Sequence, residues 1–351
     1  MSTARTTVGY PGCRIIGSGA ATPGRTLTNH DLEQMMDTSD EWIVQRTGIR
    51  SRQIARKDGT ENTMTLSVEA GRRAIADAGI DPSEIDLVML ATMTPEYTCP
   101  PTACRVAMEI GAGKGRDEGA NHDRYAGAWD FSGACCGFVF ALNNAYALIR
   151  AGMARTLLLI GADTLSKYVH YNTAGRSTAI LFGDAAGAIV LRGEQDPSVG
   201  VLAQAMLSDG SRWQELYLPF EEHNFPNDVE PQRELLNTVQ MNGRGVFKFA
   251  VGTFPEIIAQ TLDAAGLTAD EVDHFVCHQS NARILTAARD RFGLDEHKLH
   301  INIDRYGNTV AASIPLVLQD LRSAGKVREG QRIMFVGFGG GLTWGTSLWQ
   351  V

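Results

Sequence analysis

Residues 78–86 read AGIDPSEID and residues 265–273 read AGLTADEVD, so one short pattern occurs twice, 187 positions apart. In each copy an Ala-Gly pair ends a segment of helical periodicity, and an apolar run typical of a buried strand follows. A second Ala-Gly pair, at 151–152 and again at 324–325, also precedes an apolar run. These echoes predict two related halves that meet near residues 195–200, and we place the halves at residues 1–197 and 198–351.

Strand-like and helix-like segments alternate along both halves. This alternation predicts an α/β fold in which helices cover the faces of a sheet. The expected strands lie at residues 85–92, 156–160, 188–191 and 332–336, and the expected helices at 65–77, 138–149 and 254–264. Residues 208–233 are rich in Pro, Glu and Asn and are predicted to form a surface excursion or lid, and residues 111–127 a surface loop.

The composition excludes several classes of function. The chain has 351 residues, of which 44% are hydrophobic, and a net charge of -8, which does not favour sequence-independent binding to nucleic acid. The chain lacks an uncharged apolar stretch of about 18 residues, so we expect no membrane span. Its six cysteines form no CxxC pair, which argues against a metal site and favours reduced thiols in a cytoplasmic protein.

Cys135 lies in DFSGACCGF, residues 130–138, directly before the helix predicted at 138–149. The first turn of a helix presents unpaired N–H groups and the positive end of its dipole, and both favour a thiolate. The small residues around Cys135 leave room for a substrate. The alternative is a buried structural cysteine, which is a common fate of a free thiol.

His278 and Asn308 are the expected partners of Cys135. The second echo has an offset of 173 residues, which relates Cys135 to Asn308 and predicts that both lie at matching helix N-termini. His278 follows an expected strand of the second half. A thiol nucleophile with an imidazole and a carboxamide suits enolate chemistry beside a thioester carbonyl. Alternatively, His278 is a core histidine bonded to backbone, and Asn308 is a turn or helix-cap residue.

Two glycine-rich segments have different expected roles. Residues 338–345, FGGGLTWG, follow the last expected strand, and the backbone N–H of Gly340 could form an oxyanion hole with that of Cys135. The alternative is a tight turn without a ligand. Residues 15–21, IIGSGAA, are a poor match to a dinucleotide-binding fingerprint, because Thr22 replaces the third glycine and Pro23 follows.

The whole chain from about residue 14 resembles β-ketoacyl-acyl-carrier-protein synthase III, an initiating condensing enzyme of the thiolase-like superfamily. The resemblance rests on TSDEWIVQRTGI at 38–49, ACCGF at 134–138, LFGDAAGA at 181–188, HQSN at 278–281, YGNT at 306–309 and the glycines of 339–345. It implies a duplicated five-layer αβαβα fold and a homodimer. It also implies a catalytic triad of Cys135, His278 and Asn308, an oxyanion N–H from Gly340, and no metal or other cofactor, with acyl-CoA as a substrate.

The resemblance further assigns binding residues. Trp42, Arg46 and Arg176 match positions that hold coenzyme A, by stacking on adenine and by charge near the phosphates. Lys248, Arg283 and Arg291 fall where the family docks its acidic acyl carrier protein. The alternative for each charged residue is an ordinary solvated surface group.

The implied reaction has two halves. An acyl-CoA acylates Cys135, and malonyl-acyl carrier protein then loses CO₂ to give an enolate that attacks the acyl group. The product is a β-ketoacyl carrier protein, and the reaction initiates fatty-acid synthesis. The alternatives are a starter-unit condensing enzyme or acyltransferase of secondary metabolism, and a binding subunit with a vestigial triad.

Two residues depart from the family pattern. Cys136 replaces the usual alanine after the nucleophile, and we expect it to be a small buried residue. Cys99 stands where relatives carry a bulky residue that limits the acyl pocket of the neighbouring subunit. The smaller side chain of Cys99 predicts that primers longer than acetyl are accepted.

Overall fold

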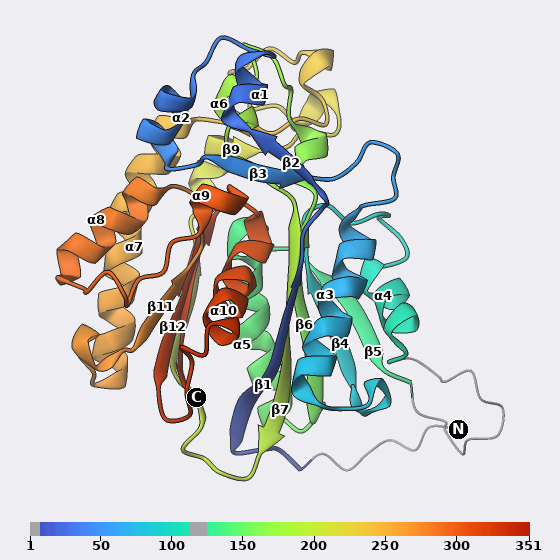
Figure 1. Cartoon of the computed structure of the whole chain (residues 1–351), viewed down its shortest axis with the longest axis vertical. Coiled ribbons are helices and arrows are strands. Elements are labelled where there is room, and N and C mark those ends of the chain that lie inside the picture. The colour runs from blue at the N-terminus through green and yellow to red at the C-terminus, as the bar shows by residue number, and fades with distance from the viewer. Residues whose placement is uncertain (1–7, 113–124) are drawn as a thin grey trace.

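Two β-sheets form the frame of the molecule in the computed structural model, which describes residues 8–112 and 125–351 (Figure 1). The first sheet has the order β1 (Gly12–Ala21), β7 (Ala185–Glu194), β6 (Thr156–Asp163), β4 (Leu87–Ala91), β5 (Gly127–Phe131). The second has the order β11 (His274–Cys277), β12 (Arg332–Gly339), β13 (Thr343–Gln350), β8 (Gly200–Ser208). All strands of the first sheet precede residue 195, and all strands of the second follow residue 199. Most of the expected loop at 111–127 lies outside the described residues.

Helices complete five layers, as the resemblance implied; the α/β pattern had predicted helices on the faces of a sheet. Buried side chains of α5 (Gly137–Arg150) and α10 (Ser313–Ser323) pack between the two sheets in one hydrophobic core. The outer face of the first sheet packs on α3 (Thr63–Ala78) and α4 (Thr102–Ile110), and that of the second on α7 (Gly243–Ala265) and α8 (Ala282–Phe292). Figure 1 shows this succession from α8 and α7, through α10 and α5, to α3 and α4. The αβαβα arrangement is therefore confirmed.

The repeated sequence pattern folds into the same local structure twice. Helices α3 and α7 both end at a glycine in the left-handed conformation, Gly79 at φ 63° and Gly266 at φ 66°. Each glycine is followed by a short 3₁₀ turn, η1 (Pro82–Glu84) or η7 (Ala269–Glu271), and then by strand β4 or β11. Glycine adopts this conformation without the steric penalty of a Cβ atom, which explains why both copies keep it.

A second duplicated feature precedes the two central helices. The 3₁₀ turns η2 (Ala134–Cys136) and η8 (Val310–Ala312) lead directly into α5 and α10. Each turn begins with a non-glycine residue at positive φ, Ala134 at 47° and Val310 at 54°.

This match corrects the expected equivalence of Cys135 and Asn308. Because α10 has 11 residues and α5 has 14, the offset is 173 after the helices but 176 before them. Cys135 is therefore equivalent to Ala311, and Asn308 lies in the loop before η8 rather than at a helix N-terminus.

Glycines in the central strands let each turn pack against the other sheet. A Cβ atom on Gly337 of β12 would lie 3.0 Å from the Cys136 sulfur, and one on Gly161 of β6 would lie 2.3 Å from the Ala311 carbonyl oxygen. Turn η2 of the first half thus rests on a strand of the second sheet, and η8 of the second half rests on a strand of the first. This reciprocal packing places both turns at the centre of the molecule.

The glycines of residues 15–21 also serve packing. They belong to strand β1, where a Cβ on Gly17 or Gly19 would lie 2.3 or 2.4 Å from a backbone oxygen of α3. The absence of side chains lets α3 approach the sheet closely. This segment is therefore part of the sheet, in agreement with the poor match to a dinucleotide fingerprint.

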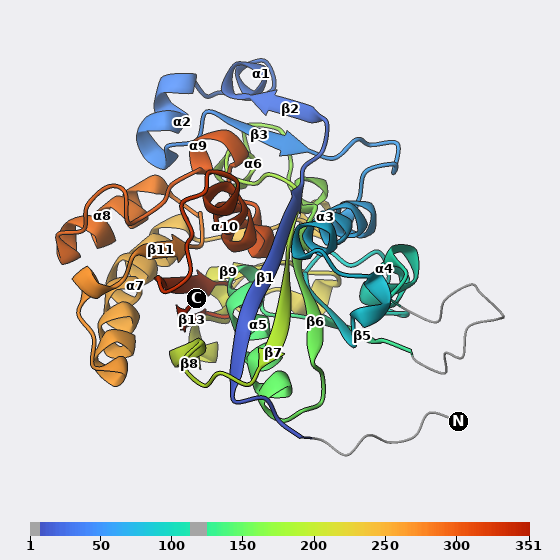
Figure 2. The same cartoon turned by 60° about the horizontal axis from the view of Figure 1, so that its bottom comes forward.

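Smaller elements cover one end of the layers (Figures 1 and 2). They are β2 (Arg25–Thr28), α1 (Asn29–Glu33), α2 (Asp40–Thr47), β3 (Ser51–Ile54), α6 (Arg176–Ala179), β9 (Leu216–Tyr217), β10 (Gln240–Met241) and α9 (Ile303–Tyr306). Buried Arg52 links this cap internally, because its guanidinium group donates to Leu27 O, Asn29 Oδ1 and Ile180 O. In the described part of the chain, no helix combines the length and the apolar character needed to cross a bilayer.

Candidate active site

A cavity of about 410 Å³ lies beneath the cap, and Cys135, His278 and Asn308 all line it. The three residues come from η2, from the end of β11 and from the loop before η8. All three side chains are buried, with exposed fractions of 6%, 1% and 5%. The structure thus brings together the three residues that the sequence placed 143 and 30 positions apart.

The environment of Cys135 favours its neutral thiol form. Burial, with a smaller contribution from the negative charge of Asp163, raises the pKa of Cys135 to about 12. Cys135 lies in a buried 3₁₀ turn before α5, where desolvation opposes the thiolate that the helix terminus favours. A base that accepts the thiol proton is therefore needed for attack.

His278 lines the same cavity and is the candidate for that base. Its Nδ1 lies 2.7 Å from Ser313 Oγ, and the Ser313 hydroxyl donates its only proton to Val310 O at 2.9 Å. Ser313 Oγ therefore accepts from Nδ1–H, which leaves Nε2 of the neutral imidazole unprotonated. Burial lowers the pKa of His278 to about 3, so the neutral form prevails at physiological pH. The ring also packs edge-on against Phe338, with centroids 5.2 Å apart.

Asn308 presents a fixed amide donor to the cavity. Its Oδ1 accepts a hydrogen bond from Val310 N at 2.9 Å, which commits the oxygen to the backbone and leaves the NH₂ group on the other side. The expected turn role of this residue is therefore observed, and it orients the group that a catalytic role requires.

A second, smaller cavity lies on the other side of Cys135. It has a volume of about 100 Å³ and a mostly apolar lining that includes Cys135, Met93, Leu218, Val239 and Gly340. Leu216 and Phe182 line both cavities, so they form the partition together with Cys135.

The glycine-rich turn between β12 and β13 passes over the nucleophile. A Cβ atom on Gly339 would lie 2.8 Å from Cys135 Cβ and 2.9 Å from its backbone nitrogen, so a side chain has no room there. Gly340 faces the smaller cavity beside Cys135. The contribution of its N–H group to an oxyanion hole stays a prediction.

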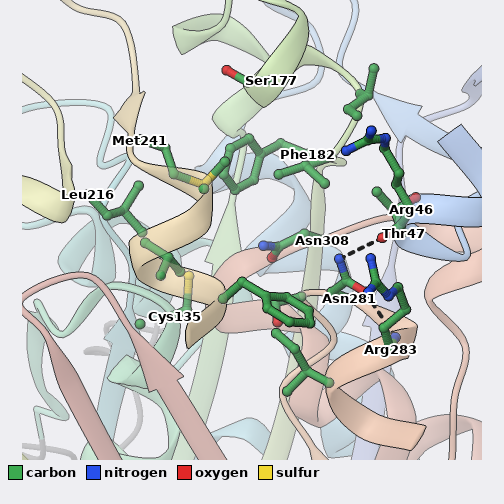
Figure 3. Close-up of a pocket in the computed structure, with 18 of the residues that line it drawn as sticks. Arg46, Thr47, Cys135, Ser177, Phe182, Leu216, Met241, Asn281, Arg283 and Asn308 are labelled. Atoms are coloured by element: carbon green, nitrogen blue, oxygen red, sulfur yellow. Dashed lines mark hydrogen bonds between the residues drawn. The ribbon is translucent and has the colours of Figure 1, made fainter. Parts of the chain in front are cut away.

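Arginines and a tryptophan surround the opposite end of the larger cavity. The guanidinium carbons of Arg46 and Arg176 lie 4.5 and 4.8 Å from the centroid of the Trp42 ring. Asn281 joins two elements here, because its Nδ2 donates to Arg46 O and its Oδ1 accepts from Arg283 N, each at 2.9 Å. Figure 3 shows Arg46 and Arg283 at one side of the cavity and Cys135 at the other.

Four of the predicted binding residues, Arg176, Lys248, Arg291 and Cys99, do not line this cavity. Lys248 of α7 and Arg291 of α8 are exposed, and so is Arg283, which reaches the cavity from the first turn of α8. Cys99 is exposed and lines neither cavity of its own chain. Its predicted role concerns a neighbouring subunit and stays a prediction.

Several residues of the site were not identified from the sequence. Ser313 orients His278, and Leu216 lies in the segment that was expected to be only a surface excursion or lid. Asp163 ends a strand that was predicted, but its side chain was not considered. Within the described residues, no cluster of three or more His, Cys, Asp or Glu side chains could hold a metal ion.

Comparison with known proteins supports one family. Residues 129–210 match the family model described as 3-oxoacyl-[acyl-carrier-protein] synthase III, and residues 262–351 match the model of its C-terminal part. The chain is 43% identical over 331 residues to β-ketoacyl-[acyl-carrier-protein] synthase III 1 of Bacillus anthracis, covering 94% of this chain and 96% of the relative. It is 40% identical over 334 residues to the synthase III of Caldanaerobacter subterraneus, covering 95% and 96%.

Solved structures agree in fold. The 3-oxoacyl-[acyl-carrier-protein] synthase III of Aquifex aeolicus superposes with a TM-score of 0.85 at 38% identity, over 97% of this chain and 100% of that one. The priming β-ketosynthase of the R1128 polyketide pathway superposes with a TM-score of 0.86 at 33% identity, over 100% and 99%. The protein is therefore a member of the 3-oxoacyl-[acyl-carrier-protein] synthase III family.

Proposed function

We propose that this enzyme condenses an acyl-CoA primer with malonyl-acyl carrier protein, releases CO₂ and forms a β-ketoacyl-acyl carrier protein, the initiating step of fatty-acid synthesis. The observation that carries the proposal is the convergence of Cys135, His278 and Asn308 in one buried cavity. A thiol, an unprotonated imidazole nitrogen and an oriented amide donor supply what the two half-reactions need.

The first half-reaction forms an acyl-enzyme. Cys135 sulfur attacks the thioester carbonyl carbon while Nε2 of His278 takes the thiol proton, and the bond from carbon to the sulfur of coenzyme A breaks. The leaving thiolate then takes that proton from His278. The small cavity of about 100 Å³ beside Cys135 receives the apolar acyl chain.

The second half-reaction makes the carbon–carbon bond. The malonyl carboxylate leaves as CO₂, and the electrons of the broken bond form an enolate. Its oxygen accepts hydrogen bonds from the Asn308 NH₂ group and from His278 when its Nε2 carries a proton. The enolate carbon attacks the acyl carbonyl, and Cys135 leaves as a thiolate that takes up a proton from water. No cofactor takes part in this scheme.

Charged groups around the cavity match the two thioester carriers. Trp42, Arg46 and Arg176 lie together at the cap, where a stacked adenine and phosphate groups would find an aromatic ring and two guanidinium groups. Exposed Arg283, Lys248 and Arg291 give a chain of net charge -8 a local basic surface for an acidic carrier protein.

We also propose that the enzyme is a homodimer. Strand β5 lies at the edge of the first sheet, and its Trp129 is 37% exposed. Tyr97 and Met108, which flank and belong to α4 beside this edge, are 52% and 56% exposed. Within the described residues β5 pairs only with β4, and a strand edge without a partner beside large apolar side chains favours pairing with a second copy. Sedimentation of the protein at several concentrations tests this proposal, and a monomer throughout would contradict it.

A second candidate function is the supply of starter units in secondary metabolism. The similarity to a priming β-ketosynthase of a polyketide pathway favours this possibility. The two candidates share the acyl-Cys135 intermediate and differ in the acceptor, so substrates must decide between them.

Mass spectrometry of the intact protein separates these functions. After exposure to acetyl-, butyryl- and octanoyl-CoA, we expect a mass increase of one acyl group that is absent in Cys135→Ala. Discharge by malonyl-acyl carrier protein supports the condensing function, whereas discharge only by another acceptor favours the second candidate. No acylation by any primer contradicts both. A strict preference for acetyl-CoA would refute the role predicted for Cys99.

A further inference from the structure

Asp163 is a buried carboxylate directly behind the active site. It ends strand β6 and has no exposed surface. Its Oδ1 accepts hydrogen bonds from Met93 N at 2.9 Å, Thr94 Oγ1 at 3.1 Å and Thr92 Oγ1 at 3.2 Å, and its Oδ2 accepts one from Ala311 N at 3.1 Å. Within the described ranges, no Lys, Arg or His forms a salt bridge with it. A buried carboxylate surrounded only by donors is best satisfied as the anion.

The two oxygens of Asp163 contact different halves of the chain. Oδ1 binds the end of β4, where Met93 also lines the small cavity. Oδ2 binds turn η8, which belongs to the second half. One carboxylate therefore connects the acyl side of the site with the turn beside His278 and Asn308.

The hydrogen bond to Ala311 is the first link of a chain that ends at His278. The Ala311 N–H and the Val310 C=O belong to the same trans peptide unit, so they point in opposite directions. The N–H donates to Asp163, and the C=O accepts from Ser313 Oγ at 2.9 Å. Ser313 Oγ in turn accepts from Nδ1–H of His278 at 2.7 Å. Hydrogen bonds in such a chain polarise one another, so a negative charge at one end strengthens the acceptor at the other.

The same turn also orients Asn308. The N–H of Val310 donates to Asn308 Oδ1 at 2.9 Å. Val310 has a φ of 54°, an unfavourable value for a β-branched residue, and such a conformation persists only where its surroundings hold it. The hydrogen bond from Ala311 to Asp163 is one such restraint.

We propose that Asp163 is a positioning residue of the condensing site, and that it acts on His278 and Asn308 through the Val310–Ala311 peptide and Ser313. This inference rests on the proposed function of the triad. Asp163 does not touch the reacting atoms. It fixes the turn and, as an anion, raises the basicity of His278 through the intervening peptide and hydroxyl.

The pKa of Asp163 determines the pH at which its role should be tested. Burial raises the pKa of Asp163 to about 7, although its four hydrogen bonds favour the charged form. The carboxylate therefore prevails only above that pH, and rates should be measured at pH 8. Two rates are needed, the acylation of Cys135 by an acyl-CoA and the decarboxylation of malonyl-acyl carrier protein.

Asp163→Asn removes the hydrogen bond from the Ala311 N–H and keeps the shape of the side chain. The three donors at Oδ1 hold the amide oxygen, so the amide NH₂ faces the Ala311 N–H and cannot accept from it. We expect decarboxylation to fall about ten- to hundred-fold, by analogy with the loss seen when the hydrogen-bond partner of a metal-binding histidine is removed. Acylation should fall less than decarboxylation, since acylation needs only His278 as a base, whereas decarboxylation needs both His278 and Asn308. Thr92→Val is the matched control, because it removes one donor to Asp163 and the acceptor of the Thr94 N–H but keeps the carboxylate and its bond to Ala311.

Ser313→Ala breaks the same chain at its other end and completes a double-mutant cycle. Substitutions in one hydrogen-bonded chain do not have additive effects. The double variant Asp163→Asn with Ser313→Ala should therefore lose no more decarboxylation activity than the worse single variant. Losses that multiply, or decarboxylation within twofold of the parent in Asp163→Asn, would overturn the inference. If Asp163→Asn does not fold, Ser313→Ala alone decides, because unchanged decarboxylation there excludes the chain. A parent protein that does not decarboxylate the malonyl thioester would instead refute the proposed function.

Discussion

Turns η2 and η8 have the same backbone and different chemistry. Both begin with a residue at positive φ, both lead into a central helix, and both rest on a glycine of the opposite sheet. The first turn carries the Cys135 sulfur, whereas Ala311 takes the equivalent place in the second. In the second turn the backbone itself is used, because its N–H and C=O groups hold Asn308, Ser313 and Asp163.

This difference shows how the two halves of a duplicated fold can carry out different parts of one reaction. The first turn supplies the nucleophile, and the second supplies the framework that orients the groups acting on the malonyl thioester. Each role depends on a backbone shape that both turns already share. The predictions below test this division, beginning with the largest expected effect.

Removing the groups oriented by the second turn should separate the two half-reactions. In His278→Ala and Asn308→Ala we expect malonyl decarboxylation to fall at least about a hundredfold, because each variant removes stabilisation of the enolate. Acylation of Cys135 should be retained to a large extent in Asn308→Ala and should be slower in His278→Ala, where water must take the thiol proton. Rapid-quench measurement of both rates checks this, and loss of acylation in both variants would show that the division of roles is wrong.

The protonation state of Cys135, the nucleophile in the first turn, can be determined from the rate of its alkylation. Because burial raises the pKa of Cys135 to about 12, the thiolate is a small fraction at pH 7 and increases with pH. We expect alkylation by iodoacetamide to accelerate about tenfold per pH unit between pH 7 and 9. The rate is followed by peptide mass spectrometry, with Cys135→Ala as the control. A rate that is already constant above pH 7 would mean that the helix terminus dominates over burial.

Gly339→Ala should disturb the first turn and leave the second intact. Its Cβ would lie 2.8 Å from Cys135 Cβ, so the β12–β13 turn or η2 must shift. We expect a loss of about 1–3 kcal/mol in the free energy of unfolding, as for other overpacked sites, together with slower acylation. Denaturant unfolding measures the first effect. Gly210→Ala, where a Cβ meets no atom within 4 Å, is the control.

The smallest effect tests the duplication itself. Gly79→Ala and Gly266→Ala place a side chain at φ 63° and 66°, and neither Cβ would meet another atom within 4 Å. Each substitution should therefore cost about 1 kcal/mol from backbone conformation alone. Thermal unfolding of both variants checks this, and clearly unequal losses would show that the two copies are not equivalent.

The α/β pattern and the motifs that carry the family resemblance could be recognised in the sequence because their signals are local. Strand and helix periodicity, the Ala-Gly echoes and the motifs around Cys135, His278 and Asn308 can all be read along the chain. The relation between Cys135 and Asn308 was misjudged by three residues, because no local feature shows that α10 is shorter than α5.

Tertiary contacts account for what the sequence did not reveal. Asp163 and Ser313 acquire their roles only when β6, η8 and β11 meet, and Leu216 reaches the cavity from a segment of irregular structure. The state of Cys135 is a similar case. A favourable helix terminus is visible in the sequence, whereas the degree of burial that outweighs it is not.

The glycines beneath the two turns, Gly337 and Gly161, also bear on how this protein could be divided. Separate polypeptides cut between β7 and β8 would each retain a sheet. In each one, the strand glycine that packs against the turn of the other half would be exposed. Neither fragment alone would hold a finished reaction centre. Activity would return only on re-association, which makes the junction a natural place for a split reporter.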